Sequence, residues 1–476
     1  MPRLAFVVVA LAVTAVATAG CKTDNPNSCE LAVNAGKPDC TMIDSGMPVM
    51  DKCKVDHDCI GTPATLVCDT QNNGGTCVQC TTMHHDACTA IATSTTPRCE
   101  NDMCVACVDD ADCGGTGVCL LDGSCAVVDN IIHATPAGSS DDDCGALTKP
   151  CGLTKAVAVA ASPKNIIKLD GDGTYNADNV TIAKTVTIDA RGATAGGAII
   201  KRANNGVILT ITSGTTTLLG GTVQGSVNGN ADGIICTSNA SPTTSITIVG
   251  SVITGNERSA INSDTCSLNI VKATISGNSH RQNQYSPAIN ASNGSLTVSQ
   301  SLFTTNQGGA ISVSNAGTFT IVGNMLSING DIGSPVGGMS LLTTSTSNRL
   351  EFNTIVNNVV LTGAPAPGVH CVSADFVARN NIIWGNVGAA GFQVDGNCKH
   401  DYSDIQALLP VNDNGNNLTP AQDPLFNADF SVLTTSPVRG KADPRSDLTG
   451  IASHDIAGKP RTTSPSDIGA YLVPAQ

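Results

Sequence analysis

Apolar and polar residues alternate in short runs between residues 155 and 400, and each run closes on an Asn. Successive closing Asn residues are 22, 28, 23, 29 and 28 residues apart. An apolar residue stands three positions before each of them: Ile253, Ile275, Phe303, Leu326, Ile355 and Ile383. Another stands eight positions before: Ile248, Ile270, Val298, Ile321, Leu350 and Ala378. Apolar residues spaced by two within a run indicate β-strands with one buried face.

A repeat of this length indicates a solenoid, in which each turn of the chain packs on the next. We expect two short strands in every turn and a third strand after them, in stretches such as Ala260-Ile261 and Ala288-Ile289. If each turn adds about 4.8 Å, residues 155–400 form a rod of roughly 45 Å. The pattern therefore predicts an all-β fold with apolar columns inside.

The closing Asn residues suit a structural role. A chain that turns a corner leaves backbone groups unpaired, and a buried amide can bond to them and to the amide of the next turn. We expect one such ladder from Asn256, Asn278, Asn306, Asn329, Asn358 and Asn386, and a second from Asn324, Asn353 and Asn381. A role as ligand donors is the less favoured alternative.

Over roughly half of the chain, this repeat resembles that of the right-handed parallel β-helix proteins of the pectin-lyase-like superfamily. The resemblance implies a single-stranded right-handed parallel β-helix. Many proteins of this superfamily are enzymes that act on polysaccharides. The repeat describes the scaffold only, so it does not distinguish one function from another.

The N-terminus is typical of an exported protein. Residues 4–17 form a mostly apolar run after Arg3, too short to span a bilayer and suited to a signal peptide over residues 1–20. Thr18-Ala19-Gly20-Cys21 resembles the lipobox of bacterial lipoproteins, which implies that Cys21 carries the lipid. We expect a protein anchored by lipid to the cell envelope, at the outer membrane or cell surface. Ordinary secretion is the alternative.

The cysteine content also indicates export, because 21 Cys are typical of an oxidising compartment. After a linker over residues 21–52, residues 53–125 contain three small Cys-rich repeats, each too poor in apolar residues to fold without disulfides. Their quartets are Cys53, Cys59, Cys68 and Cys77; Cys80, Cys88, Cys99 and Cys104; and Cys107, Cys113, Cys119 and Cys125. The segment resembles the Cys-rich modules at the front of bacterial surface lipoproteins.

Metal binding is the alternative for this region. Cys77-x-x-Cys80 and Cys104-x-x-Cys107 have the spacing of a zinc site, although disulfides are favoured outside the cytosol. Asp109, Asp110 and Asp112 leave a structural calcium as an alternative to a solvated acidic turn. We expect no other metal and no cofactor.

Further pairs of residues predict contacts within the solenoid. Three disulfides are expected: Cys236–Cys266 and Cys371–Cys398, each about one turn apart, and Cys144–Cys151 in the lead-in over residues 126–154. Cys29 and Cys40 remain as a pair in the linker. Residues 156–161 are expected to form a short capping helix, and Glu351 and Arg379 an ion pair between neighbouring turns.

The C-terminal segment, residues 401–476, contains four phrases in order: Asp423-Pro-Leu-Phe426, Ser436-Pro437, Asp455-x-x-Gly458-Lys-Pro-Arg461 and Asp467-Ile-Gly-Ala-Tyr471. They resemble the terminal module of bacterial β-helix surface proteins called choice-of-anchor Q. Since the last turn of a solenoid exposes unpaired strand edges, we expect this segment to cap it.

Charge and residue spacing restrict the function. A net charge of −14 argues against a nucleic-acid partner. Glycoside hydrolysis needs two carboxylates roughly 5–9.5 Å apart, and the acidic residues of the repeats do not share one register relative to the closing Asn. The remaining candidates for catalysis are Asp375, Asp395 and Arg379.

Candidates for binding are His280, Arg281 and Tyr285 in a polar insertion, and Trp384, which should point outward and stack on a sugar ring. We expect a non-catalytic surface protein that presents its rod for adhesion or for binding polysaccharide or protein, with the membrane as a partner through the lipid. The alternatives are a polysaccharide lyase or hydrolase and a purely structural envelope protein.

Overall fold

The computed structural model describes residues 53–474 except 55–58, 60–66, 72–74, 82–86, 89–95, 115–116, 179, 193–196, 203, 227–230, 239–243, 281–284, 316, 346, 373–375, 390 and 463. The signal peptide, Cys21, the Cys29–Cys40 pair, Arg281 and Asp375 therefore lie outside the described residues. The chain divides into two compact units, residues 1–105 and 106–476. In the part of the chain that the structure describes, no helix is long and apolar enough to cross a bilayer.

The first unit contains two antiparallel strand pairs, β1 (Val67–Asp69) with β2 (Thr76–Val78) and β3 (Arg98–Glu100) with β4 (Met103–Val105). In every Cys quartet the first Cys bonds the third and the second bonds the fourth. The bonds are Cys53–Cys68, Cys59–Cys77, Cys80–Cys99, Cys88–Cys104, Cys107–Cys119 and Cys113–Cys125. Every sulfur of the three quartets is in a disulfide, so none is a thiolate that could bind zinc, and the zinc alternative is excluded for these cysteines.

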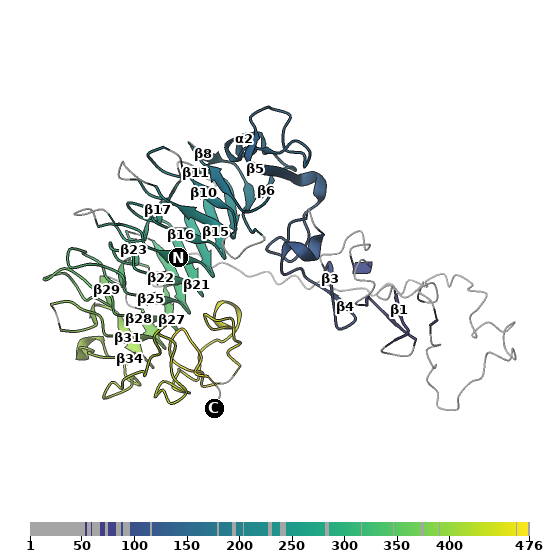
Figure 1. The fold of residues 1–476 in the computed structure, drawn as a ribbon. Coiled ribbons are helices and arrows are strands. Elements are labelled where there is room, and N and C mark those ends of the chain that lie inside the picture. The colour runs from purple at the N-terminus through teal and green to yellow at the C-terminus, as the bar shows by residue number, and fades with distance from the viewer. Residues whose placement is uncertain are drawn as a thin grey trace, which may run out of the picture. The chain divides into compact units, whose positions relative to one another are not determined.

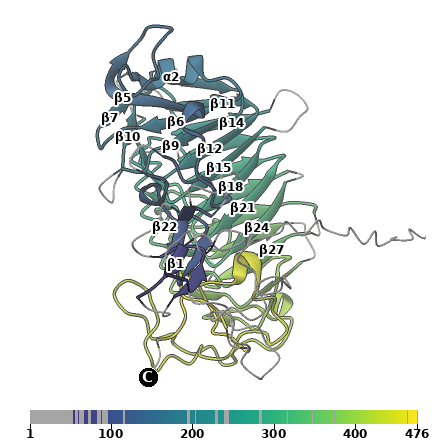
Figure 2. The same ribbon diagram turned by 90° about the vertical axis from the view of Figure 1, so that its right-hand side faces the viewer.

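The second unit is a coil of three parallel sheets, whose stacked strands are visible in Figure 1 and Figure 2. The first sheet has 11 strands: β5 (Ile131–Ser139), β6 (Ile166–Leu169), β9 (Val186–Asp189), β12 (Thr215–Leu219), β15 (Ser245–Val249), β18 (Ser267–Val271), β21 (Ser295–Ser299), β24 (Thr318–Val322), β27 (Arg349–Glu351), β30 (Val377–Arg379) and β33 (Lys399–Asp401). The second has 10: β7 (Thr174–Asn176), β10 (Ile199–Lys201), β13 (Thr222–Gln224), β16 (Val252–Thr254), β19 (Thr274–Ser276), β22 (Leu302–Thr304), β25 (Met325–Ser327), β28 (Thr354–Val356), β31 (Ile382–Trp384) and β34 (Asp404–Ile405). The third has nine: β8 (Val180–Ala183), β11 (Leu209–Ser213), β14 (Ile234–Thr237), β17 (Ile261–Asp264), β20 (Ile289–Ser292), β23 (Ile311–Ser314), β26 (Met339–Leu342), β29 (Val369–Val372) and β32 (Val394–Gly396).

The apolar columns lie inside the coil, as predicted. The residues three positions before the closing Asn pair in register from strand to strand of the second sheet, and all six are fully buried. Val223 and Ile405 extend this column at its two ends. The column is continuous, so the aliphatic side chains of successive turns stack directly on one another.

Both predicted amide ladders are present. In the first ladder, which runs from Asn256 to Asn386, each side-chain Nδ2 donates to the Oδ1 of the next Asn at 2.8–2.9 Å. From Asn278 onward, Nδ2 also donates to a backbone carbonyl of the preceding turn. The second ladder joins Asn324, Asn353 and Asn381 at 3.0 Å. All of these amides are buried and bonded to neighbouring turns, so they are not surface ligand donors.

The coil begins earlier than the repeat predicts, at Ile131 rather than at residue 155, because β5 pairs with β6. The capping helix α2 spans Leu153–Val159, three residues before the predicted start, and its buried side chains lie in the main core. The predicted disulfides Cys144–Cys151, Cys236–Cys266 and Cys371–Cys398 are all formed.

The third Cys quartet belongs to the second unit and packs on the outside of the first sheet. Val118 and Ala126 join a small buried cluster with residues of β5, β6 and β12. Asp110, in the 3-10 helix η2 (Asp110–Cys113), pairs with Arg191 at 2.7 Å, and Arg191 also binds Asp189 at 2.8 Å. Burial, with the neighbouring Asp110 carboxyl, raises the pKa of Asp189 to about 7.

In the acidic turn of this quartet, the carboxylates accept hydrogen bonds from nearby backbone N–H groups. Asp109 caps η2 by accepting from the backbone N of Ala111, and Asp112 accepts from the backbone N of Val108. The carboxylate of Asp110 accepts from the backbone N of Cys119 in addition to its ion pair. These contacts favour the turn over the calcium alternative.

The C-terminal segment both closes the coil and lies along its side. The 3-10 helix η4 (Pro410–Asn412) covers the last turn, where Asn412 donates to the carbonyls of Gly396 and Cys398. The rest of the segment, including η5 (Gly450–Ala452), packs laterally on the last turns, which differs from the predicted end cap. Its apolar cluster contains Val322, Phe352 and Ile382 of the coil with Val432, Val438, Ala442, Ala452, Ile468 and Val473.

Arg461 links the phrases that resemble an anchor module to the coil. The guanidinium is 3% exposed and donates to the carbonyls of Gly469 and Ala470 at 2.7 and 3.1 Å. It also lies 4.5 Å from the ring centre of Phe352 on the coil. Asp455 and Asp467 of the same phrases accept only from backbone N–H groups of the segment. The phrases that resemble an anchor module therefore hold this segment together and against the coil.

Replacing a ladder amide should destabilise the coil. In Asn329→Ala, Asn306 loses the acceptor for its backbone N–H and its Nδ2, and the carbonyl of Phe303 loses a donor. Since buried unpaired groups cost about 1–3 kcal/mol each, we expect the free energy of unfolding to fall by about 3 kcal/mol or more in a urea titration. The control is Gln307→Ala, one residue beyond Asn306 and exposed. Equal stability of the two variants would contradict the ladder's role.

Removing the Arg461 guanidinium should loosen the C-terminal segment from the coil. Trp384, the only Trp in the chain, packs on the cluster of this segment and reports on it through its fluorescence. In Arg461→Met we expect a red shift of the emission, because water reaches the indole ring. Arg439→Met, at an exposed arginine of the same segment, should leave the spectrum unchanged. An unchanged spectrum in Arg461→Met would show that the guanidinium does not hold the segment in place.

Candidate functional site

A column of polar side chains runs along the outer face of the third sheet. Neighbouring strands place its members in register: Asn262, Asn290, Ser312, Ser340, His370 and Asp395. At the end of the column nearest the start of the coil, Asn290 donates to Asn262 at 3.2 Å, and Asn262 donates to the buried carboxylate of Asp232 at 3.0 Å. In each strand the column residue stands next to an apolar residue that points into the coil. Because successive side chains of a strand point to opposite faces, the column residues point outward.

At the other end of the column, in the last two turns of the third sheet, His370 and Asp395 form a hydrogen-bonded pair. His370 Nδ1 lies 2.6 Å from Asp395 Oδ1, and both side chains are 20% exposed. The other carboxylate oxygen, Oδ2, accepts from the backbone N of Ala366 at 3.0 Å. Because a carboxylate only accepts, Nδ1 donates the hydrogen of this bond, and Nε2 is the ring nitrogen that Asp395 leaves free. This arrangement orients the imidazole as a base.

Two residues of the polar insertion, His280 and Tyr285, are described, and neither contacts the His370–Asp395 pair. His280 is exposed, and Tyr285 is half-buried, with its ring against the backbone at Gly333. Gly333 is needed there because a Cβ at this position would fall 2.4 Å from the tyrosine ring. Tyr285 therefore braces the loop that leads into β26, and His280 remains available to a ligand.

Arg379 lies in a separate cleft of about 410 Å³ between the first sheet and the C-terminal segment. Its neighbours are Arg349, Glu351, Asp443 and Arg445. The predicted Glu351–Arg379 ion pair is wrong, although the two residues are in register. Glu351 binds Arg349 on its own strand at 2.8 Å, and Arg379 approaches Asp443 at 3.5 Å.

Three arginines and three carboxylates line this cleft, so its charges balance. Burial acts to raise the pKa of Asp443, but the hydrogen bonds and charge of Arg445 outweigh it and hold the pKa below its usual value. Arg445 donates to both oxygens of Asp443, at 3.0 and 3.1 Å. The Arg379–Asp443 ion pair joins the coil to the C-terminal segment, so the position of Arg379 is that of a structural residue.

Trp384 points out of the coil as predicted, but it is not a free platform for a sugar. The indole is half-buried and packs on the apolar cluster of the C-terminal segment. The segment covers this part of the second sheet through apolar contacts with Phe352 and Ile382 and a hydrogen bond from the backbone N of Ala470 to the hydroxyl of Thr354. Asp375, the remaining catalytic candidate, lies outside the described residues.

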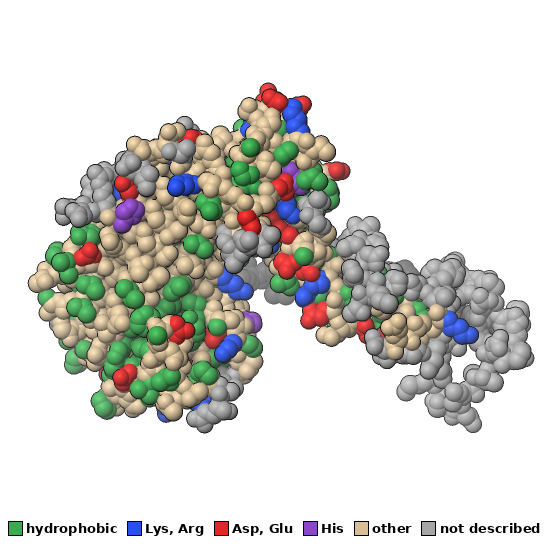
Figure 3. All heavy atoms as spheres, in the orientation of Figure 1, with side chains coloured by type: hydrophobic (Ala, Val, Ile, Leu, Met, Phe, Trp, Pro, Cys, Tyr) green, Lys and Arg blue, Asp and Glu red, His purple; other side chains and the backbone are tan. Residues whose placement is uncertain are grey.

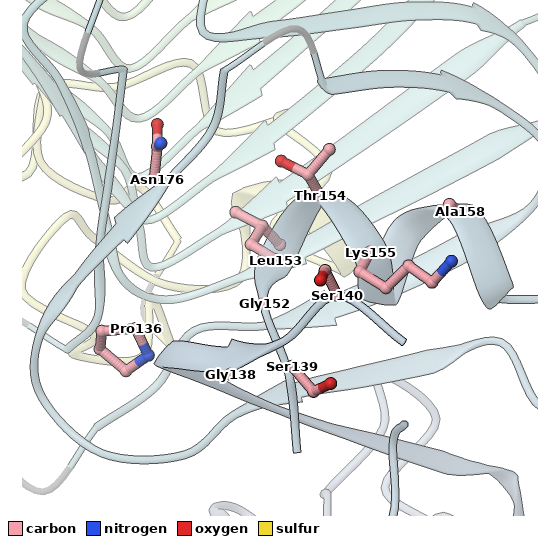
Figure 4. Close-up of a pocket in the computed structure, with 10 residues that line it drawn as sticks. All are labelled: Pro136, Gly138, Ser139, Ser140, Gly152, Leu153, Thr154, Lys155, Ala158 and Asn176. Atoms are coloured by element: carbon pink, nitrogen blue, oxygen red, sulfur yellow. The ribbon is translucent and has the colours of Figure 1, made fainter. Parts of the chain in front are cut away.

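A further cavity of about 360 Å³ lies at the N-terminal end, between the end of β5 and helix α2 (Figure 4). Its lining consists mainly of small side chains such as Ser139, Ser140 and Thr154. Lys155 is its only ionisable lining residue, and it is bonded to the exposed Asp142. The lining of this cavity therefore contains no pair of ionisable side chains that could act as acid and base in catalysis.

Asp395 was predicted as a catalytic candidate, but its hydrogen bond with His370 was not. Distance from the closing Asn does not place the two residues in register, because loops of different length separate that Asn from the third strand. A register counted from the first apolar residue of the third strand would have found the pair. Met339, Val369 and Val394 start their strands in register, and the next residue in each is Ser340, His370 or Asp395.

Residues 232–403 match the family model described as a right handed beta helix region. The chain matches no curated protein. Among solved structures, the crystal structure of pectate lyase Pel9A aligns with a TM-score of 0.44 and 13% identity, over 72% of this chain and 96% of that chain. With the strand pairing described above, the family match identifies the coil of this chain as a right-handed parallel β-helix.

Proposed function

We propose that this chain is an exported, lipid-anchored protein of the cell envelope that binds a neutral polysaccharide along the outer face of the third sheet. The observation that carries the proposal is the in-register polar column from Asn262 to Asp395. Amide and hydroxyl groups that both donate and accept hydrogen bonds suit the hydroxyls of sugars. The turns repeat about every 4.8 Å, close to the length of one pyranose unit.

The charges favour an uncharged ligand over a polyanion. The chain has a net charge of −14, and the column itself ends in Asp395 and starts beside Asp232. A polyanionic glycan approaching this face would be repelled at long range. In the view of Figure 3, Lys, Arg, Asp and Glu side chains are sparse on the surface of the coil.

Binding is tested on an array of neutral and acidic polysaccharides with the full chain and an Asn262→Ala/Asn290→Ala double variant. A hydrogen bond contributes about 1 kcal/mol, so losing two should weaken binding to the neutral ligand about 30-fold. The control is Thr297→Ala, at an outward position of the first sheet. The proposal fails if the wild-type chain binds no polysaccharide or only acidic ones. It also fails if the double variant binds the neutral polysaccharide as tightly as the wild type does.

The membrane partnership rests on Cys21. We expect a palmitate analogue fed to the producing cells to label the protein, and the label to disappear in Cys21→Ala together with the protein's membrane association. Ser28→Ala, at another residue of the N-terminal segment, should keep both. Membrane association that persists without the label in Cys21→Ala would argue against the lipid anchor.

A further inference from the structure

We propose that Ser340, His370 and Asp395 act together as nucleophile, base and orienting acid in the hydrolysis of O-acyl esters. For its natural substrate, an acylated glycan on the third sheet, this inference rests on the proposed function. The chemistry itself rests on three residues in successive turns of one column, Ser340 in β26, His370 in β29 and Asp395 in β32.

The base is already oriented. Asp395 is held by the backbone N of Ala366 on one oxygen and binds His370 Nδ1 on the other. The first contact comes from the loop that leads into β29 and the second from β29 itself. The bond to Asp395 leaves Nε2 as the ring nitrogen that can take a proton from the nucleophile, and the carboxylate is placed to stabilise the imidazolium that then forms.

The nucleophile is the serine on the other side of the histidine. Ser340 is 8% exposed, and no described residue forms a hydrogen bond with its hydroxyl. Three other buried serines of the coil are bonded to carbonyls, Ser251 to that of Gly220, Ser301 to that of Ser299 and Ser403 to that of Asp401, whereas the hydroxyl of Ser263 also lacks a partner among the described residues. Ser340 differs from Ser263 in its place beside an oriented histidine, and acyl transfer needs a nucleophile next to such a base. The Ser–His contact is expected to tighten when substrate binds.

The same geometry argues against cleavage of a glycosidic bond. That reaction needs two carboxyl groups roughly 5–9.5 Å apart, one of them free to protonate the leaving oxygen. Both oxygens of Asp395 are engaged, and the next residue in the column is a histidine rather than an acid. A hydroxyl, an imidazole and a carboxylate instead match acyl transfer, whose reaction centre is an ester carbonyl.

The reaction balances with water as the only co-reactant. Ser340 Oγ attacks the ester carbonyl carbon while His370 Nε2 takes its proton. The bond from that carbon to the sugar oxygen then breaks, and the sugar hydroxyl leaves with the proton from Nε2. Water attacks the acyl-serine and gives a proton to Nε2. The bond to Oγ breaks, Oγ recovers the proton, and the carboxylic acid is released.

The test measures hydrolysis of p-nitrophenyl acetate and release of acetate from acetylated xylan by the full chain. We expect Ser340→Ala and His370→Ala to lower kcat/KM at least 10³-fold and Asp395→Asn at least 10²-fold. The control is Ser276→Ala, at a half-exposed serine of β19 in the second sheet and outside the column; its rate should stay within twofold. Trp384 fluorescence checks that each variant keeps its fold.

A second measurement follows the serine directly. A fluorophosphonate probe should modify Ser340 in the wild type, and peptide mass spectrometry should find no modification there in His370→Ala. Absence of turnover by the wild type, or turnover retained in Ser340→Ala, would overturn the inference. Glycan binding without ester hydrolysis would overturn it and leave the proposed function standing. Ester hydrolysis without glycan binding would support the three residues and refute the proposed ligand.

Discussion

The buried amide ladders are the interaction on which the coil depends. Asn329 is typical of the first ladder: its Oδ1 accepts from Asn306 in the preceding turn, and its Nδ2 donates both to Phe303 of that turn and to Asn358 of the next. The spacing of the turns is therefore fixed by hydrogen bonds as well as by apolar stacking. The residue before each ladder Asn has a left-handed backbone conformation; Ile328, a β-branched residue, has φ of 57° there. Such a conformation persists only where the surrounding bonds outweigh its strain.

This constraint lets the loops vary without moving the strands. The connections from the second sheet to the third include the insertion around His280 and the loops that carry Gly333 and Ala366, yet β20, β23, β26, β29 and β32 remain in register. A side chain on the outer face therefore keeps the same neighbours in the turns above and below. The chemistry of the face depends on which residue occupies each place, and in the third sheet the last two turns place His370 beside Asp395.

Much of the fold follows from local repetition and was predictable for that reason. The apolar columns and the Asn ladders repeat in almost every turn, so their period and register can be read without knowing any long-range contact. The disulfides Cys236–Cys266 and Cys371–Cys398 were predictable because their spacing equals one turn. Within each Cys quartet the connectivity was not, since several pairings fit one spacing.

What could not be predicted depends on contacts between segments that do not repeat. Glu351 and Arg379 are in register, but Arg349 two residues away and Asp443 from the C-terminal segment provide closer partners. Trp384 points outward as the strand period requires, and only the lateral position of the C-terminal segment decides that its ring is covered. The same holds for the candidate site, because loops of unequal length separate His370 and Asp395 from the residues that define the repeat.

The last turn shows why the segment after β34 is needed. His400 lies in the core and Asp404 in the final strand; burial lowers the pKa of the former to about 4 and raises that of the latter to about 7. The stability linked to His400 is present above its unfolded pKa of about 6.5 and is lost as the pH falls toward 4, whereas that linked to Asp404 is lost as the pH rises toward 7. As the pH changes between about 4 and 7, the contributions of His400 and Asp404 to the free energy of unfolding change in opposite directions. They therefore largely cancel, and a change of pH does little to stabilise the last turn. Its stability depends instead on coverage by Asn412 and Asn417, whose amides donate to carbonyls of that turn.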